Sequence, residues 1–221
     1  MPRVTDAYLA ARREQLLDAV RICVDRSGLQ GATMEGIIQA SGMSTGTVYK
    51  YIRSKDEGIE AAMGTALDGL TTALLPHLTA DPLPPPAVVV EQLARTVETF
   101  AEREAFSLLR MAVHGWSAAL SSPGLLEKTA PHYRVFRDLL RAAATTWRTD
   151  GALPPDAEPS DVASALLSLL MGFAAQQGVL GGTSAGAQAR GFAALSAGGT
   201  PDASRPHAAV PRPRTAPGRQ P

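Results

Sequence analysis

TMEGIIQASGMSTGTVYKY, residues 33–51, divides into a short apolar segment, a turn and a short polar segment. Thr33 is a favourable N-cap for a helix that ends at Ser41-Gly42, and Ser44 is a favourable N-cap for a second helix through Tyr51. Two short helices joined by a three- or four-residue turn that contains Gly are typical of a helix-turn-helix. The stretch therefore predicts this motif.

The second helix of the motif has the side chains that DNA recognition requires. A helix enters the major groove only if its exposed residues are small or polar, as they are over residues 44–51. Gly46 lets the DNA backbone approach closely, and a helix N-terminus attracts a phosphate. Lys55, at the start of the next helix, is a candidate for another phosphate contact. The candidate DNA-binding residues are Thr33, Ser44, Thr45, Gly46, Thr47, Tyr49, Lys50, Tyr51 and Lys55.

Helical periodicity continues on both sides of the motif, and no stretch alternates as a strand does. The expected further helices cover residues 8–27, 55–76, 87–103, 105–120, 125–149 and 160–180. Ser54 is a favourable N-cap for the helix that begins at residue 55. The proline-rich residues 81–86 must form a loop. We therefore expect an all-α protein, with a three-helix DNA-binding domain over residues 1–53 and a helical-bundle domain over residues 54–181.

Residues 182–221 differ in composition from the rest of the chain. They are rich in Gly, Ala, Ser, Pro and Arg and poor in large apolar side chains. Such a segment buries too little apolar surface to offset the entropy that folding costs. We expect residues 182–221 to be a disordered basic tail.

Charge is distributed unevenly along the chain, although 21 basic residues balance 21 acidic ones. The first 55 residues carry eight basic against five acidic side chains, whereas residues 56–181 carry eight against fifteen. Partners respond to the local field rather than to its sum, so the basic N-terminal region suits a polyanion.

The remaining composition points to a cytoplasmic protein without a cofactor. Cys23 is the single cysteine, which excludes an intramolecular disulfide, and no secretion signal opens the chain. Residues 162–180 are apolar but interrupted by Ser, Gly and Gln, as expected for a buried helix rather than a membrane span. The histidines His77, His114 and His132 lack the spacing of a metal site, so we expect neither a metal nor a cofactor.

The same turn also matches a pattern of serine hydrolases. Gly42-Met-Ser-Thr-Gly46 fits the G-x-S-x-G nucleophile elbow, with Ser44 as the nucleophile. An elbow requires a buried strand directly before the serine, whereas residues 35–41 have a helical pattern. A helical hairpin that never meets DNA is the other alternative. The DNA-binding interpretation is favoured over both, and we expect the protein not to be an enzyme.

The N-terminal region resembles the TetR family of repressors over roughly residues 12–62. The resemblance is carried by the segments at 16–19, 27–28, 33–34 and 42–49, together with Ile37 and Ser54-Lys55. Four positions depart from the usual family residues, namely Val24, Ile38, Ile52 and Gly58. These departures concern packing more than DNA binding.

The resemblance implies a homodimer in which residues 44–51 read a palindromic operator and Tyr49 and Lys55 contact its backbone. It also implies that a small molecule, here expected to be apolar, releases the repressor from DNA. A constitutive DNA-binding dimer without a ligand is the alternative. The candidate pocket residues are Met63, Leu67, Phe106, Arg110, Met111, His114 and Trp116. The candidate interface residues, from the last two long helices, are Phe136, Leu140, Leu166, Leu169, Leu170 and Phe173.

Overall fold

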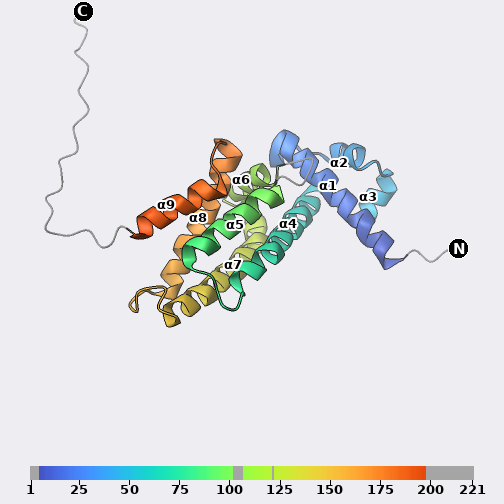
Figure 1. Ribbon diagram of the computed structural model, residues 1–221. Helices are drawn as coiled ribbons and strands as arrows, with labels where there is room; N and C mark the ends of the chain where they lie inside the picture. Colours follow the sequence, from blue (N-terminus) through green and yellow to red (C-terminus); the bar gives the residue numbers. More distant parts are fainter. Residues whose placement is uncertain (1–4, 102–106, 121, 198–221) are drawn as a thin grey trace, which may run out of the picture.

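The structure, a computed structural model, describes residues 5–101, 107–120 and 122–197 (Figure 1). These residues form nine helices and no strand, which confirms the all-α prediction. The helices are α1 (Asp6–Gly31), α2 (Met34–Ser41), α3 (Thr45–Tyr51), α4 (Lys55–Leu78), α5 (Pro86–Ala101), α6 (Leu108–Ala119), α7 (Pro123–Thr149), α8 (Pro159–Val179) and α9 (Ala185–Ala197). In Figure 1, α2 and α3 lie at one end, α8 and α9 lie towards the other, and α4 runs between them.

The predicted caps set the helix boundaries of the N-terminal region. The side chains of Thr33, Ser44 and Ser54 accept hydrogen bonds from the third backbone N–H beyond each, at 3.1, 3.3 and 3.2 Å. Each cap therefore satisfies a donor that the first turn of a helix leaves free. The first helix runs further than predicted, because the chain resumes helical geometry after a kink at Gly28, where φ is 70°.

The head, formed by α1, α2 and α3, has its own apolar core. Leu16, Val20, Ile37 and Val48 are fully buried there, and each such side chain contributes about 1.5–3 kcal/mol by leaving water. The cluster also includes Met63 of α4 and apolar residues of α6 and α7. The head is therefore packed onto the body, the part formed by α4 to α9.

The departures at Ile52 and Gly58 lie against each other in the head. A Cβ at Gly58 would lie 2.9 Å from Cδ1 of Ile52 and 3.3 Å from Cγ2 of Val20. Gly58 thus leaves the space that Ile52 fills in the head core, where Ile52 is 2% exposed.

The body packs around a second core, which includes Leu93, Leu140, Trp147 and Phe173. Trp147 is 1% exposed, and its indole N–H donates to the carbonyl oxygen of Pro84 at 2.7 Å. This bond ties the proline-rich loop to the body core near the end of α7. The loop ends one residue earlier than predicted, since Pro86 begins α5.

The prediction of a disordered tail is wrong for its first part, since residues 185–197 form α9, which lies against α5. Ala185 and Ala189 are buried, and the backbone N–H of Ala185 donates to Oε1 of Glu98 at 2.8 Å. Small side chains let two helices approach closely, so a segment poor in large apolar residues still packs. Residues 198–221 lie outside the described residues.

The candidate interface residues lie mostly inside the protomer. Phe136, Leu140, Leu166, Leu170 and Phe173 are buried in the body core, and Leu169 is half-buried against it. The periodicity of α7 and α8 identified their buried faces, but these faces pack against helices of the same chain. An interface on α7 and α8 must therefore use the opposite faces.

Among the described residues, α8 is the one helix long and apolar enough to cross a membrane by length and composition. Only 22% of its most apolar window is buried inside the protomer. Its buried face joins the body core, whereas Ala165, Ser168 and Gly172 lie exposed on the other side.

Candidate nucleic-acid interface

Three hydrogen bonds hold the turn between α2 and α3 in one geometry. Gly42 ends α2 in the left-handed conformation, with φ of 63°. The hydroxyl of Ser41 accepts from the backbone N–H of Met43 at 3.1 Å and donates to the carbonyl oxygen of Ile38 at 2.9 Å. The amide of Gln15 in α1 donates to the carbonyl oxygen of Ser41 at 2.9 Å. These bonds hold the turn that leads into α3 against the end of α2 and against α1.

Helix α3 buries one side chain and exposes a polar face. Val48 is fully buried in the head core, whereas Thr45, Gly46, Tyr49 and Lys50 are exposed. A Cβ at Gly46 would meet no other atom within 4 Å. The exposed face therefore offers hydroxyl, phenol and ammonium groups, with open space beside Gly46.

The other candidate DNA contacts have partners within the head. Thr33 and Ser44 are exposed caps, and the Ser44 hydroxyl also lies 2.8 Å from Oγ1 of Thr47. Thr47 is half-buried, and Tyr51 is half-buried against the head core. The structure thus brings all the candidates to α3 and the ends of its neighbours, but at different exposures.

Lys55 has a structural role that its sequence position does not reveal. Its Nζ donates to the carbonyl oxygens of Leu29 and Gln30, both at 3.3 Å. A cation at this point satisfies two carbonyls at the end of α1 and opposes the negative pole of that helix. Lys55 therefore ties the start of α4 to the end of α1.

The serine-hydrolase alternative fails on the local geometry. Ser44 caps α3 and is separated from α2 only by the turn residues Gly42 and Met43, so a helix and a turn precede it where the elbow needs a strand. The strand that a nucleophile elbow needs is absent from the part of the chain that the structure describes.

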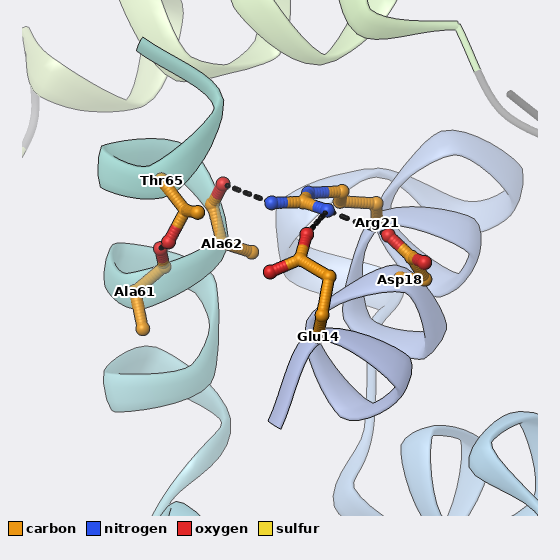
Figure 2. Close-up of polar contacts among 6 residues, drawn as sticks. All are labelled: Glu14, Asp18, Arg21, Ala61, Ala62 and Thr65. Carbon is orange, nitrogen blue, oxygen red and sulfur yellow. Dashed lines mark hydrogen bonds and ion pairs between the residues drawn. The ribbon is translucent and has the colours of Figure 1, made fainter. Parts of the chain in front are cut away.

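A buried arginine joins the head to α4 (Figure 2). The guanidinium of Arg21 in α1 lies 2.6 Å from carboxylate oxygens of both Glu14 and Asp18, and Nη2 donates to the carbonyl oxygen of Ala62 at 3.4 Å. Arg21 is 5% exposed, so this charge is satisfied inside the junction. The acidic residues three and seven positions before Arg21 were the available sequence signal.

A second ion pair joins α6 to α1. Nε and Nη2 of Arg110 donate to the two carboxylate oxygens of Asp25 at 2.9 and 2.7 Å. The hydrogen bond from Arg110 lowers the pKa of Asp25 and outweighs the opposing effect of burial. His114 approaches the same helix, since a Cβ at Gly28 would lie 3.8 Å from its Cε1. Both residues were predicted to face a ligand, and the structure places both at the junction with α1.

The body contains an apolar cavity bounded by α4, α5, α6, α7 and α8, hereafter the inner cavity. It has an empty volume of about 960 Å³, open solvent at its mouth included. Of the predicted pocket residues, Met63, Leu67, Met111 and Trp116 line it, Arg110 and His114 are not among its lining residues, and Phe106 lies outside the described residues.

The polar groups of the inner cavity were not predicted from the sequence. They include Tyr133, whose hydroxyl accepts from the indole N–H of Trp116 at 2.5 Å, and His132, whose Nδ1 lies 2.9 Å from Oδ1 of Asp68. Burial raises the pKa of Tyr133, so this phenol stays neutral. Among the described residues that line the inner cavity there is no lysine or arginine, and these residues suit an uncharged group.

Comparison with curated proteins finds relatives among transcriptional regulators, although no family model matches the chain. The chain is 45% identical over 56 residues to the HTH-type transcriptional repressor Rv1474c of Mycobacterium tuberculosis, a match that spans 25% of this chain and 30% of that protein. It is 29% identical over 171 residues to the HTH-type transcriptional regulator BetI of Burkholderia thailandensis, spanning 77% and 84%. The match thus covers less than a third of the mycobacterial relative's length.

Solved structures share the fold at low sequence identity. A TetR transcription regulator from Haloarcula marismortui superposes with a TM-score of 0.69 at 17% identity, over 84% of this chain and 96% of that one. AibR in complex with isovaleryl coenzyme A and operator DNA superposes with a TM-score of 0.62 at 18% identity, over 83% and 97%. The head and the body therefore adopt an arrangement already known from DNA-binding regulators.

Proposed function

The chain belongs to the TetR family of transcriptional regulators, and we propose that it is a cytoplasmic repressor that binds a palindromic operator as a homodimer. The observation that carries this proposal is the exposed polar face of α3, held by the turn bonds of Ser41 and by the buried Val48. The mycobacterial repressor matches the chain over 56 residues, a length similar to that of the head. Regulators of this family are not enzymes, in agreement with the helical setting of Ser44.

DNA recognition would use α3 in the major groove. Tyr49 is 49% exposed and Lys50 is exposed, and both have donors that reach phosphates or base edges. The excess of basic residues among the first 55 supplies the attraction to DNA that does not depend on sequence. Specificity for the base sequence would then come from the residues of α3 near Gly46, where the backbone of the helix can come closest to the DNA.

Dimerisation would bury the faces of α7 and α8 that the protomer leaves open. The apolar α8 exposes Ala165 and Gly172, and its end exposes Val179, which is 67% accessible. An apolar helix that its own chain covers so little needs a partner, and small side chains permit close packing of a second copy. Two-fold symmetry would then place two α3 helices about 34–36 Å apart, or a multiple of this, as successive major grooves require.

Release from DNA would start at the inner cavity, occupied by a small molecule with a large apolar part. Met63 of α4 lines this cavity, and the carbonyl of the adjacent Ala62 accepts the hydrogen bond from Arg21 of the head. Leu109 and Met111 of α6 line it too, and Arg110 between them binds Asp25 of α1. A ligand that fits better when α4 or α6 is displaced would therefore shift the heads away from their DNA-bound spacing.

The DNA-binding proposal is tested by substituting the exposed face of α3. We expect Tyr49→Ala and Lys50→Ala each to weaken binding to a DNA fragment that the wild-type protein selects from random sequences. Lys50→Ala should also lower the slope of log affinity against log salt by about one if its ammonium contacts a phosphate. Arg95→Ala in α5 is the matched control, since it removes an exposed positive charge from the body. Unchanged gel-shift affinity in both α3 variants would refute the assignment.

The sensing proposal is tested separately against the alternative of a constitutive DNA-binding dimer. Compounds are screened for release of the bound fragment, and each active compound is tested again on Met171→Trp, which fills the inner cavity. Loss of release in this variant, with DNA binding intact, supports sensing through the cavity. Release that survives the substitution places the ligand elsewhere, and failure of a chemically diverse library favours the constitutive dimer.

A further inference from the structure

A second cavity, hereafter the outer cavity, adjoins the inner one on the side of α7. It has an empty volume of about 1140 Å³, open solvent included. Both cavities are lined by Met63, Trp116, Tyr133, Leu167 and Met171. The hydrogen bond from Trp116 to Tyr133 therefore crosses the wall that the two cavities share.

The outer cavity differs from the inner one in charge. Arg134 and Arg137 line it and lie three residues apart on one face of α7. Within the part of the chain that the structure describes, neither has an ion pair, whereas Arg141 further along the same helix is paired with Asp138 at 3.4 Å. Two like charges on successive turns repel each other, so an anion placed between them relieves that repulsion.

Apart from Thr129 and Tyr133, most of the remaining lining of the outer cavity is apolar, and large apolar side chains are exposed at its rim. Leu120 is 91% exposed and Leu126 is 51% exposed. A molecule that crosses from the inner cavity past Tyr133 would thus meet apolar walls first and the two guanidinium groups at the solvent side. Tyr133 adds a phenol hydroxyl at the crossing point.

We propose that the two cavities form one site for an amphipathic organic anion, with its hydrocarbon part in the inner cavity and its carboxylate or phosphate at Arg134 and Arg137. The inference rests on the proposed sensing function and names the class of its ligand. Guanidinium groups bind both anions through charge-assisted hydrogen bonds, often in pairs. The inner cavity alone would select ligands by the volume of their apolar part, and the arginine pair would also select them by charge.

The experiment compares decanoate, decyl phosphate and decanol, which share one hydrocarbon chain. Their dissociation constants are measured by calorimetry on the full chain, on the double variant Arg134→Gln/Arg137→Gln and on Arg141→Gln as control. We expect the wild type to bind at least one anion about tenfold or more tighter than decanol. The double variant should lose most of this preference for the anion over decanol while it binds decanol as before. The control Arg141→Gln should retain the preference. The two anions distinguish a carboxylate ligand from a phosphorylated one.

Four results would overturn the inference. Equal binding of the anions and decanol to the wild type, or a charge preference that survives in the double variant, refutes the anion site and leaves sensing of neutral molecules intact. Weakened dimerisation of the double variant with an unchanged ratio assigns the arginines to a subunit interface. If none of the three compounds binds, the proposed sensing cavity fails together with this inference.

Discussion

At the scale of a single side chain, Lys55 has one role in the fold and a second, proposed role at the DNA. Its sequence position suggests a phosphate contact, while its Nζ binds the carbonyl oxygens of Leu29 and Gln30. Both roles are compatible, because an ammonium has three donors. A substitution at Lys55 should therefore change the stability of the head as well as its affinity for DNA.

We expect Lys55→Ala to lower the free energy of unfolding by about 1 kcal/mol, because two carbonyls lose their donor. Lys55→Gln keeps an N–H donor but not the charge, so it should restore part of this stability. If Lys55 contacts a phosphate, neither variant should recover the wild-type salt dependence. Urea denaturation and salt-titrated gel shifts measure the two effects. Equal stability of Lys55→Ala and the wild type would contradict the structural role.

Residues with local partners were predictable, and residues with distant partners were not. The caps Thr33, Ser44 and Ser54 bond to backbone atoms three residues away, so their types and positions suffice. Arg21 and Arg110 instead bind groups 41 and 85 residues away. Arg110 was assigned to the pocket because its neighbours are apolar, yet its own side chain turns towards α1.

At the scale of elements, the contact of α6 with α1 depends on an ionised carboxylate. Arg110 holds the pKa of Asp25 below its ordinary value of about 3.9. A carboxyl with a lowered pKa stabilises the folded state above that ordinary value, and the contribution is lost as pH falls through the lowered pKa. The ion pair should therefore hold α6 to α1 throughout the neutral range.

We expect Asp25→Asn to lower the free energy of unfolding at pH 7 by about 1 kcal/mol, because Arg110 is half-exposed and solvent screens the pair. The difference from the wild type should stay constant from pH 8 to about pH 5 and shrink below about pH 4. Asp138→Asn, in the exposed pair with Arg141, is the control and should change little. A difference that persists unchanged at pH 3 would contradict the account of Asp25.

The sequence predicted where the helices lie along the chain more accurately than it predicted what each helix packs against. The predicted segments at 125–149 and 160–180 correspond to α7 and α8 within a few residues. Their apolar residues were assigned to a subunit interface, yet Leu140 and Phe173 are fully buried by the same chain. Periodicity shows which face of a helix is buried, but it carries no information on what buries it.

At the scale of the whole molecule, α9 completes the body by covering α5. Truncation after residue 181 removes the buried Ala185 and Ala189 together with the half-buried Phe192. We expect this truncation to lower the free energy of unfolding by about 2–4 kcal/mol, because the surface of α5 beneath α9 becomes exposed. Truncation after residue 197 keeps all nine described helices and serves as the control. Equal thermal stability of the two truncated proteins would refute a structural role for α9.

The cavities belong to the whole molecule, because the inner cavity forms where five helices meet and the outer cavity where four of them do. Four candidate pocket residues from α4 and α6 line the inner cavity, since those helices were expected to face the body's interior. The sequence could not identify Tyr133, Met171 and the arginines of α7 as pocket residues, because no local pattern shows that α7 and α8 lie opposite α4. The same packing joins the cavity wall to the head through Met63 and Ala62.

The central claim is that two copies of α3 read one two-fold symmetric DNA site. Its most direct test is selection of bound fragments from random-sequence DNA by the full chain, followed by sequencing. We predict an enriched palindrome whose half-sites lie about 34–36 Å apart along the DNA, or a multiple of this distance. Enrichment of an asymmetric single site, or no enrichment over the starting pool, would contradict the account.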